Sequence, residues 1–214
     1  MKAMARGFDL VVAHDCLRRA DGRLADWMAR VALETDSIRW RRPFDPVDAL
    51  ARSILYQQLS GKAAATIIGR VEAACGLRTL DAEALSSMSE ADLRACGVSR
   101  AKALALADLA AHAIRGELPS TREMARMSDD VIIERLTRVR GIGRWTAEML
   151  LVFRLGRPDV LPLDDLGVRK GLQIVDDLGE LPSRLELAQR GETWAPFRTL
   201  AALYLWRVAD SGSP

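Results

Sequence analysis

Two adjacent aspartates, Asp164 and Asp165, stand in the segment DDLGVRKGL at the point where a helical run begins. A carboxylate there can cap the helix by accepting backbone N–H groups, which stabilises a helix by about 1 kcal/mol. Its negative charge can also stabilise positive charge that develops on a reacting substrate. Taken alone, the position favours a helix cap for one of the two residues.

A second candidate for chemistry is the segment RVRGIGRWTAEML, residues 138–150, in which Gly141 and Gly143 separate two helical runs. Glycine adopts positive φ readily and lets a neighbouring backbone approach closely. The second run starts beside Gly143, so its unpaired N–H groups and the positive end of its dipole form a site for an anion. A bare G-x-G between helices more often only closes a turn.

The elements that must position these residues are all helical. Apolar residues recur at three- and four-residue steps, and no run of alternating β-branched residues is bounded by turns. We expect about ten helices joined by short loops, with helices over 45–59, 61–75, 131–139 and 144–155 among them. Serines in N-cap positions mark several helix starts; they are Ser60, Ser89, Ser99, Ser128 and Ser183.

Composition limits the function only weakly. The chain has 214 residues, with 31 basic and 29 acidic side chains and a net charge of +2, which permits a local basic face but does not require a polyanionic partner. It contains no apolar run long enough to span a membrane and no signal peptide pattern at its N-terminus, so we expect an intracellular protein. The scattered Cys16, Cys75 and Cys96 are expected to be free and buried.

Four motifs together resemble those of one family. They are ILYQQLSGKAA, GIGRWTAEMLL, LPLDDLGVRKG and WAPFRTLAALYLW, and the resemblance extends over most of the chain, from about Ile38 to Trp206. The pattern of a helical hairpin, a Pro-containing loop and an Asp at the next helix start is similar to the helix-hairpin-helix (HhH-GPD) superfamily of DNA glycosylases, and most similar to its 3-methyladenine DNA glycosylase II branch, in a compact form without the extra N-terminal domain.

The resemblance implies an all-α fold of two helical lobes with the active site in the cleft between them. Residues 1–49 and 156–214 would form one lobe, and residues 50–155 would form the other, ending in the hairpin at about 129–155. It also implies roles for individual residues. The catalytic residue would be Asp165, supported by Asp164, and the base pocket would contain Trp145, Met149 and Trp206.

The resemblance further implies how DNA is held. Gln58 or Leu59 would fill the gap left by a flipped base, and the amides of Gly141, Gly143 and Thr146 would hold a phosphate. Further phosphate contacts would come from Arg144, Arg169 and Lys170. Carbonyl oxygens of Thr137, Val139 and Gly141 would hold a Na⁺ or K⁺ ion, whereas no cofactor is required and no iron–sulfur cluster is expected, because the cysteines lack the spacing for one.

Family members that also cut the DNA strand carry a Lys where this chain has Trp145. We therefore expect a monofunctional, monomeric glycosylase that excises alkylated bases such as 3-methyladenine and 7-methylguanine from double-stranded DNA. A base methylated on a ring nitrogen is already cationic, so it leaves with little help from an acid, and Asp165 would stabilise the positive charge that develops on the sugar. A non-catalytic protein that binds DNA damage, or a glycosylase for oxidised or mispaired bases, remains as an alternative.

Overall fold

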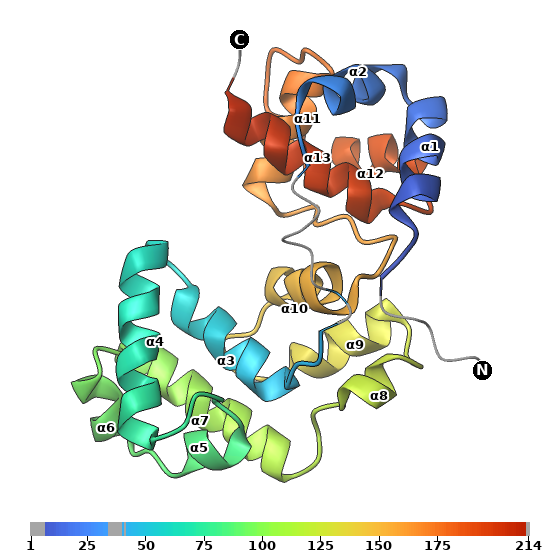
Figure 1. Ribbon diagram of the computed structural model, residues 1–214. Coiled ribbons are helices and arrows are strands. Elements are labelled where there is room, and N and C mark those ends of the chain that lie inside the picture. The colour runs from blue at the N-terminus through green and yellow to red at the C-terminus, as the bar shows by residue number, and fades with distance from the viewer. Residues whose placement is uncertain (1–6, 34–39, 41, 213–214) are drawn as a thin grey trace. The chain divides into compact units, whose positions relative to one another are not determined.

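The computed structural model describes residues 7–33, 40 and 42–212, and these divide into two compact units. Residues 42–150 form the middle unit. Residues 7–33, Trp40 and residues 151–212 form the terminal unit, which therefore combines both ends of the chain (Figure 1). Every regular element in the described residues is helical. None of their helices is long and apolar enough to cross a membrane.

The middle unit is built around the long helix α7, against which α3, α5 and α6 pack (Figure 1). Its core is made of leucines and other apolar side chains that have lost all contact with solvent, such as Leu50, Leu106 and Leu109. The helices are α3 (Pro46–Tyr56), α4 (Gly61–Cys75), α5 (Ala82–Ser86), α6 (Glu90–Ala95), α7 (Arg100–Ile114), α8 (Thr121–Met124), α9 (Asp129–Leu136) and α10 (Arg144–Leu150).

In the terminal unit, α11 and α13 pack along one another, and the N-terminal helices α1 and α2 pack against α13 (Figure 1). Gly171 makes this close packing possible, because a Cβ there would run into the backbone carbonyl of Leu205. The elements are α1 (Leu10–Ala20), α2 (Gly22–Arg30), the π-helix η2 (Leu151–Leu155), α11 (Leu166–Val175), α12 (Arg184–Gly191), the 3₁₀ helix η3 (Glu192–Trp194) and α13 (Arg198–Ser211).

Asp21 joins three elements of the terminal unit. It caps α2 by accepting the N–H of Leu24 at 3.1 Å, and it accepts the indole N–H of Trp194 at 2.6 Å. Arg190 of α12 forms an ion pair with the same carboxylate at 2.6 Å. The Asp21 side chain is only 3% exposed, so these partners replace the water that it has lost.

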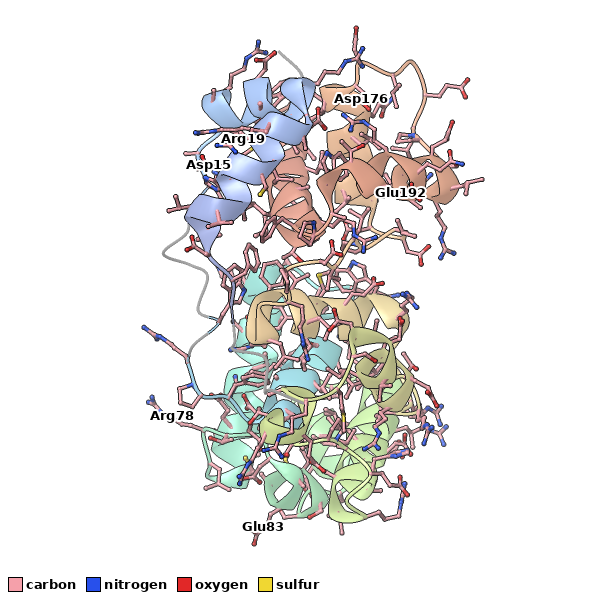
Figure 2. The ribbon with its side chains drawn as sticks, turned by 90° about the vertical axis from the view of Figure 1, so that its right-hand side faces the viewer. Asp15, Arg19, Arg78, Glu83, Asp176 and Glu192 are labelled. Atoms are coloured by element: carbon pink, nitrogen blue, oxygen red, sulfur yellow. The ribbon has the colours of Figure 1, made fainter. Side chains whose placement is uncertain are left out.

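Most charged side chains lie on the outside of each unit. In the middle unit, Arg78 and Glu83 point away from the helices, and in the terminal unit Asp15 and Arg19 lie on the outer face of α1 (Figure 2). The side chains labelled in Figure 2 include both an acid and a base in each unit, in agreement with the small net charge.

Several expected helix starts are confirmed. Ser60 and Ser99 cap α4 and α7, and Ser89 and Ser183 form capping boxes with Asp92 and Glu186 respectively. A further capping box, Ser120 with Glu123, opens α8 and was not expected from the sequence. Ser128 occupies the N-cap position of α9, but its side chain makes no capping bond.

Other expectations were wrong in detail. The described residues contain thirteen α-helices rather than about ten, because short capped segments form separate single-turn helices. The second helix of the hairpin is α-helical only to Leu150 and continues as a π-helix. The compact middle unit spans residues 42–150, and the expected lobe of residues 50–155 stays a prediction. Cys16 is exposed, and only Cys96 is buried.

Candidate functional site

Asp165 is the N-cap residue of α11, the ten-residue helix of the terminal unit. Its Oδ1 atom accepts the backbone N–H of Val168 at 2.9 Å. The same oxygen accepts the indole N–H of Trp206 at 2.8 Å. These two donors and the positive end of the helix dipole stabilise the negative charge of the carboxylate. The capping role and a chemical role for Asp165 are therefore compatible.

Trp206 lies on α13, and its indole ring is held on two sides. Its N–H is bound to Asp165, and Phe153 of the π-helix stacks on it with a centroid distance of 5.6 Å and an interplanar angle of 23°. Trp206 is half-buried, and Phe153 is 43% exposed. Asp165, Trp206 and Phe153 thus place a carboxylate beside two aromatic rings that solvent can reach.

Gly167, in the first turn of α11, makes room for the bond between Trp206 and Asp165. A Cβ built on Gly167 would lie 2.8 Å from Cδ1 of Trp206 and 3.1 Å from Oδ1 of Asp165, whereas ordinary van der Waals contacts begin at 3.4 Å. Gly167 and Gly171, one turn later, form a glycine-lined strip on the side of α11 that faces α13. The absence of a side chain at Gly167 lets the indole reach the carboxylate.

The charged residues around Asp165 mostly have structural partners. Asp164 is exposed and forms an ion pair with Arg184 at 2.9 Å. Arg169 donates from Nε to the carbonyl of Pro182 at 2.8 Å, which holds the segment before α12. Lys170 is exposed on α11. A supporting role for Asp164 and phosphate contacts by Arg169 and Lys170 remain predictions.

In the middle unit, α9 and α10 form the expected hairpin through a turn at residues 137–143. Gly141 has φ +78°, and a Cβ there would lie only 3.0 Å from the Cβ of Ala105 on α7, so glycine is needed for both reasons. Gly143 does not have positive φ and has open space around it, contrary to the expectation for both glycines. Val139 and Ile142 are buried and anchor the turn.

The turn is also fixed by side chains from other helices. Asp108 of α7 accepts the backbone N–H of Arg140 at 2.8 Å. Gln57, which follows α3, donates from Nε2 to the carbonyl of Gly141 at 2.9 Å. The hairpin is therefore positioned by α3 and α7 as well as by its own two helices.

The side chains at the start of α10 differ in their exposure to solvent. Thr146 is buried, Met149 is half-buried and Trp145 is 44% exposed. Arg144 forms an ion pair at 2.9 Å with Glu148, whose side chain is 5% exposed. Because the first N–H groups of a helix lack intrahelical partners, this end of α10 suits an anion, and an exposed indole lies beside it.

The turn between α3 and α4, residues 57–59, carries the two candidates for the wedge. Gln58 has φ +56°, a left-handed conformation that is uncommon for residues other than glycine, and Leu59 is 39% exposed. Ser60 then caps α4. The turn thus places two large side chains at a point where the backbone is conformationally constrained.

The three carbonyls expected to hold a monovalent cation belong to the hairpin turn. The carbonyl of Val139 accepts the N–H of Ile142 at 3.1 Å, and that of Gly141 accepts the amide of Gln57 at 2.9 Å. A carbonyl oxygen has two lone pairs, so these hydrogen bonds leave each oxygen able to bind an ion. A monovalent cation held by these carbonyls and that of Thr137 stays a prediction.

Several residues of these sites were missed by sequence reasoning. Phe153 was assigned no role, because an apolar residue in the run MLLVFRL is indistinguishable from core. Gln57 reaches the carbonyl of Gly141 through a tertiary contact that no local pattern reveals. Gly167 and Gly171 could have been found, since two glycines four residues apart on a helix indicate a close helix contact.

Comparisons with known proteins agree with this geometry. The family model of the HhH-GPD superfamily base excision DNA repair proteins matches residues 51–196. The DNA-3-methyladenine glycosylase 1 of Schizosaccharomyces pombe is 40% identical over 166 residues, which cover 77% of this chain and 73% of the relative.

Two solved structures are also similar. The S. pombe 3-methyladenine DNA glycosylase in complex with abasic-DNA has a TM-score of 0.74 and 36% identity, covering 91% of this chain and 94% of the other. The DNA-3-methyladenine glycosidase of Bacillus halodurans has a TM-score of 0.79 and 37% identity, covering 91% and 87%. The helical hairpin, the capped aspartate and these matches lead to one assignment: the chain belongs to the HhH-GPD superfamily of base excision DNA repair proteins.

Proposed function

We propose that this protein is a monofunctional DNA glycosylase that excises alkylated bases, such as 3-methyladenine and 7-methylguanine, in base excision repair. The observation that carries the proposal is the geometry of Asp165, a carboxylate held by Trp206 and by the start of α11. Family membership and relatives named as 3-methyladenine glycosylases support the substrate class.

The chemistry follows from the charge of the substrate. Methylation of a purine ring nitrogen makes the base cationic, so the bond between base and sugar breaks with little need for a general acid. Positive charge then develops on the sugar, and the carboxylate of Asp165 stabilises it. Water completes the hydrolysis at C1′, and the same carboxylate would orient that water. The products are a free base and an abasic site.

Aromatic rings would recognise the flipped base. A base outside the duplex loses its stacking, and stacking on an aromatic side chain returns about 1–3 kcal/mol. Trp206 with its partner Phe153 supplies such a surface beside Asp165. A cationic base adds a cation–π contribution to this stacking that a normal base lacks. This difference favours alkylated bases.

DNA would be held mainly through its backbone. The amides of Gly141, Gly143 and Thr146 at the start of α10 would bind a phosphate, with Arg144 nearby. A monovalent cation on the carbonyls of Thr137, Val139 and Gly141 would add positive charge beside that phosphate. Binding through amides needs few basic side chains, which is consistent with a net charge of only +2. We propose double-stranded DNA as the partner of a monomeric protein.

The proposal includes the absence of strand cleavage. A lyase needs an amine that attacks C1′ and forms a Schiff base, whereas this chain has Trp145 in the hairpin. Lys102 already donates to two backbone carbonyls of the middle unit. We therefore expect no Schiff base to be trapped by borohydride and no strand break without alkali.

The test is release of free methylated bases from methylated duplex DNA by the wild type and by Asp165→Asn. Asp177→Asn is a matched control: Asp177 is exposed, lies in the same unit and has φ +53°, which Asn tolerates well. We expect Asp165→Asn to bind abasic-site DNA but to release bases roughly 10³-fold more slowly, while the control keeps wild-type activity.

Other outcomes would select the alternatives. If the wild type binds DNA but releases no base, the protein is a non-catalytic damage-binding module and Asp165 is only a helix cap. If it releases 8-oxoguanine or mispaired bases in preference to methylated ones, the substrate class is wrong. The similar fold of the 8-oxoguanine glycosylase/lyase of Clostridium acetobutylicum, at 20% identity, shows the fold alone.

A further inference from the structure

The side chain of Lys102 forms hydrogen bonds within the middle unit. It belongs to the first turn of α7, and its ammonium group donates to the carbonyl of Leu55 at 2.8 Å and to that of Gln57 at 2.6 Å. Both acceptors lie at the C-terminal end of α3, where carbonyls lack intrahelical partners and a positive charge is favoured. Burial removes the ammonium from water and lowers the pKa of Lys102.

The two residues that carry these carbonyls lie just before the turn at residues 57–59 and at its first position. Gln57 has an extended ψ of 131°, and Gln58 turns into the left-handed region at φ +56°. A residue other than glycine in this conformation carries strain of about 1 kcal/mol. Such a conformation persists only where surrounding contacts determine it, and Lys102 supplies two of them.

A third contact fixes the other side of the turn. The side-chain amide of Gln57 donates to the carbonyl of Gly141 in the hairpin. Gln57 is thus held through its main chain by Lys102 and through its side chain by the hairpin. The position of the turn is coupled to that of the hairpin within this unit.

A cavity of about 80 Å³ lies beside the turn, lined by Leu55, Leu59, Lys102, one residue of α4 and the segment 97–99 that precedes α7. It is large enough for a methyl group or a few water molecules. Without the lysine contacts, Leu59 would have space into which to move and the strained turn would be free to relax. Lys102 therefore holds the turn in place and also lines the space into which the turn would move without it.

We propose that Lys102 is a positioning residue that keeps the turn at residues 57–59 preformed, so that Gln58 and Leu59 can enter the gap left by a flipped base. This inference rests on the proposed function, because the turn acts as a wedge only if the protein flips bases. A preformed turn avoids the entropic penalty of ordering a loop at the moment of base flipping. Lys102 itself touches neither the base nor the sugar.

The test is a double-mutant cycle on single-turnover excision of an alkylated base from duplex DNA. Lys102→Met removes the ammonium while keeping the length of the side chain, and Q58A/L59A removes both wedge candidates. We expect each change alone to lower the excision rate by roughly tenfold or more. Lys102→Met in the Q58A/L59A background should change the rate by less than about twofold, because the turn has already lost its function.

Lys62→Met is the matched control, because Lys62 is exposed in the first turn of α4 and the change removes the same charge. It should keep wild-type excision. Thermal unfolding shows whether each variant is folded, and Lys102→Leu, which also removes the donor, replaces Lys102→Met if that variant does not fold.

Three results would overturn the proposal: wild-type excision by Lys102→Met, wild-type excision by Q58A/L59A, or equal losses from Lys102→Met in both backgrounds. Equal losses would indicate a general effect on folding or DNA binding. Failure of the proposed function gives a different result, since the wild type would then release no alkylated base at all.

Discussion

Substitution of Gly167 by Ala tests the geometry of the Asp165 carboxylate, the proposed catalytic group, without removing any functional group. The added Cβ would lie 2.8 Å from Cδ1 of Trp206 and 3.1 Å from Oδ1 of Asp165. Ordinary contact begins at 3.4 Å, so the indole must retreat by about 0.6 Å. That displacement acts on the 2.8 Å bond between Trp206 and Asp165, because both partners lie against the new methyl group.

The magnitude follows from what the bond contributes. A hydrogen bond to a charged group is worth about 1.5–3 kcal/mol, and each 1.4 kcal/mol is a factor of about ten. Loss of the bond, with movement of the carboxylate from its proposed place beside the sugar, should therefore lower the rate of base excision by roughly ten- to a hundredfold. DNA binding through the hairpin should change little, since the hairpin belongs to the middle unit.

The assay is single-turnover release of 3-methyladenine from methylated duplex DNA, combined with abasic-site DNA binding and thermal unfolding. Gly69→Ala is the control, since Gly69 lies within helix α4 and a Cβ there meets nothing within 4 Å. That change should leave excision unaltered and stabilise the helix by about 0.5–1 kcal/mol. A folded Gly167→Ala protein that excises at the wild-type rate would refute the argument that Gly167 positions Trp206 and Asp165.

Two further predictions concern the hairpin and stability. Gly141→Ala should weaken binding to abasic-site duplex DNA, measured by fluorescence anisotropy, and lower the melting temperature of the protein. A left-handed backbone conformation costs about 1–2 kcal/mol for a residue with a Cβ, and the added methyl group would lie only 3.0 Å from Ala105. Unchanged affinity and an unchanged melting temperature would contradict this prediction. Burial alone would raise the pKa of Asp21, but Trp194 and Arg190 outweigh it and hold that pKa below 3.8. The carboxylate therefore stabilises the fold above pH 3.8, and this contribution is lost as pH falls through the lowered pKa. Asp21→Asn should lower the free energy of unfolding, measured by urea titration, by about 1.5–3 kcal/mol at pH 7. The difference in this free energy between the variant and the wild type should shrink below pH 3.8. A difference that does not depend on pH would show that the charge of Asp21 is not responsible.

Features that depend on a few neighbouring residues could be predicted from the sequence. The serine caps of α4, α6, α7 and α12 are where the pattern indicated, because a capping bond joins residues only two or three positions apart. The positive φ of Gly141 follows from the same local logic. The continuation of α10 as a π-helix was not predicted, since the apolar run from Met149 to Leu155 reads equally well as a longer α-helix.

The sequence by itself also determined the all-helical class and the motifs that place the chain in its family. Only the tertiary structure decided which side chains meet at each site. Trp206 and Asp165 are hydrogen-bonded although they are 41 positions apart in the sequence, and Lys102 and the carbonyl of Gln57 are 45 positions apart. Such meetings depend on how closely two helices pack, and that distance is set by interlocking surfaces, such as the glycine-lined strip of α11, rather than by the properties of either segment alone.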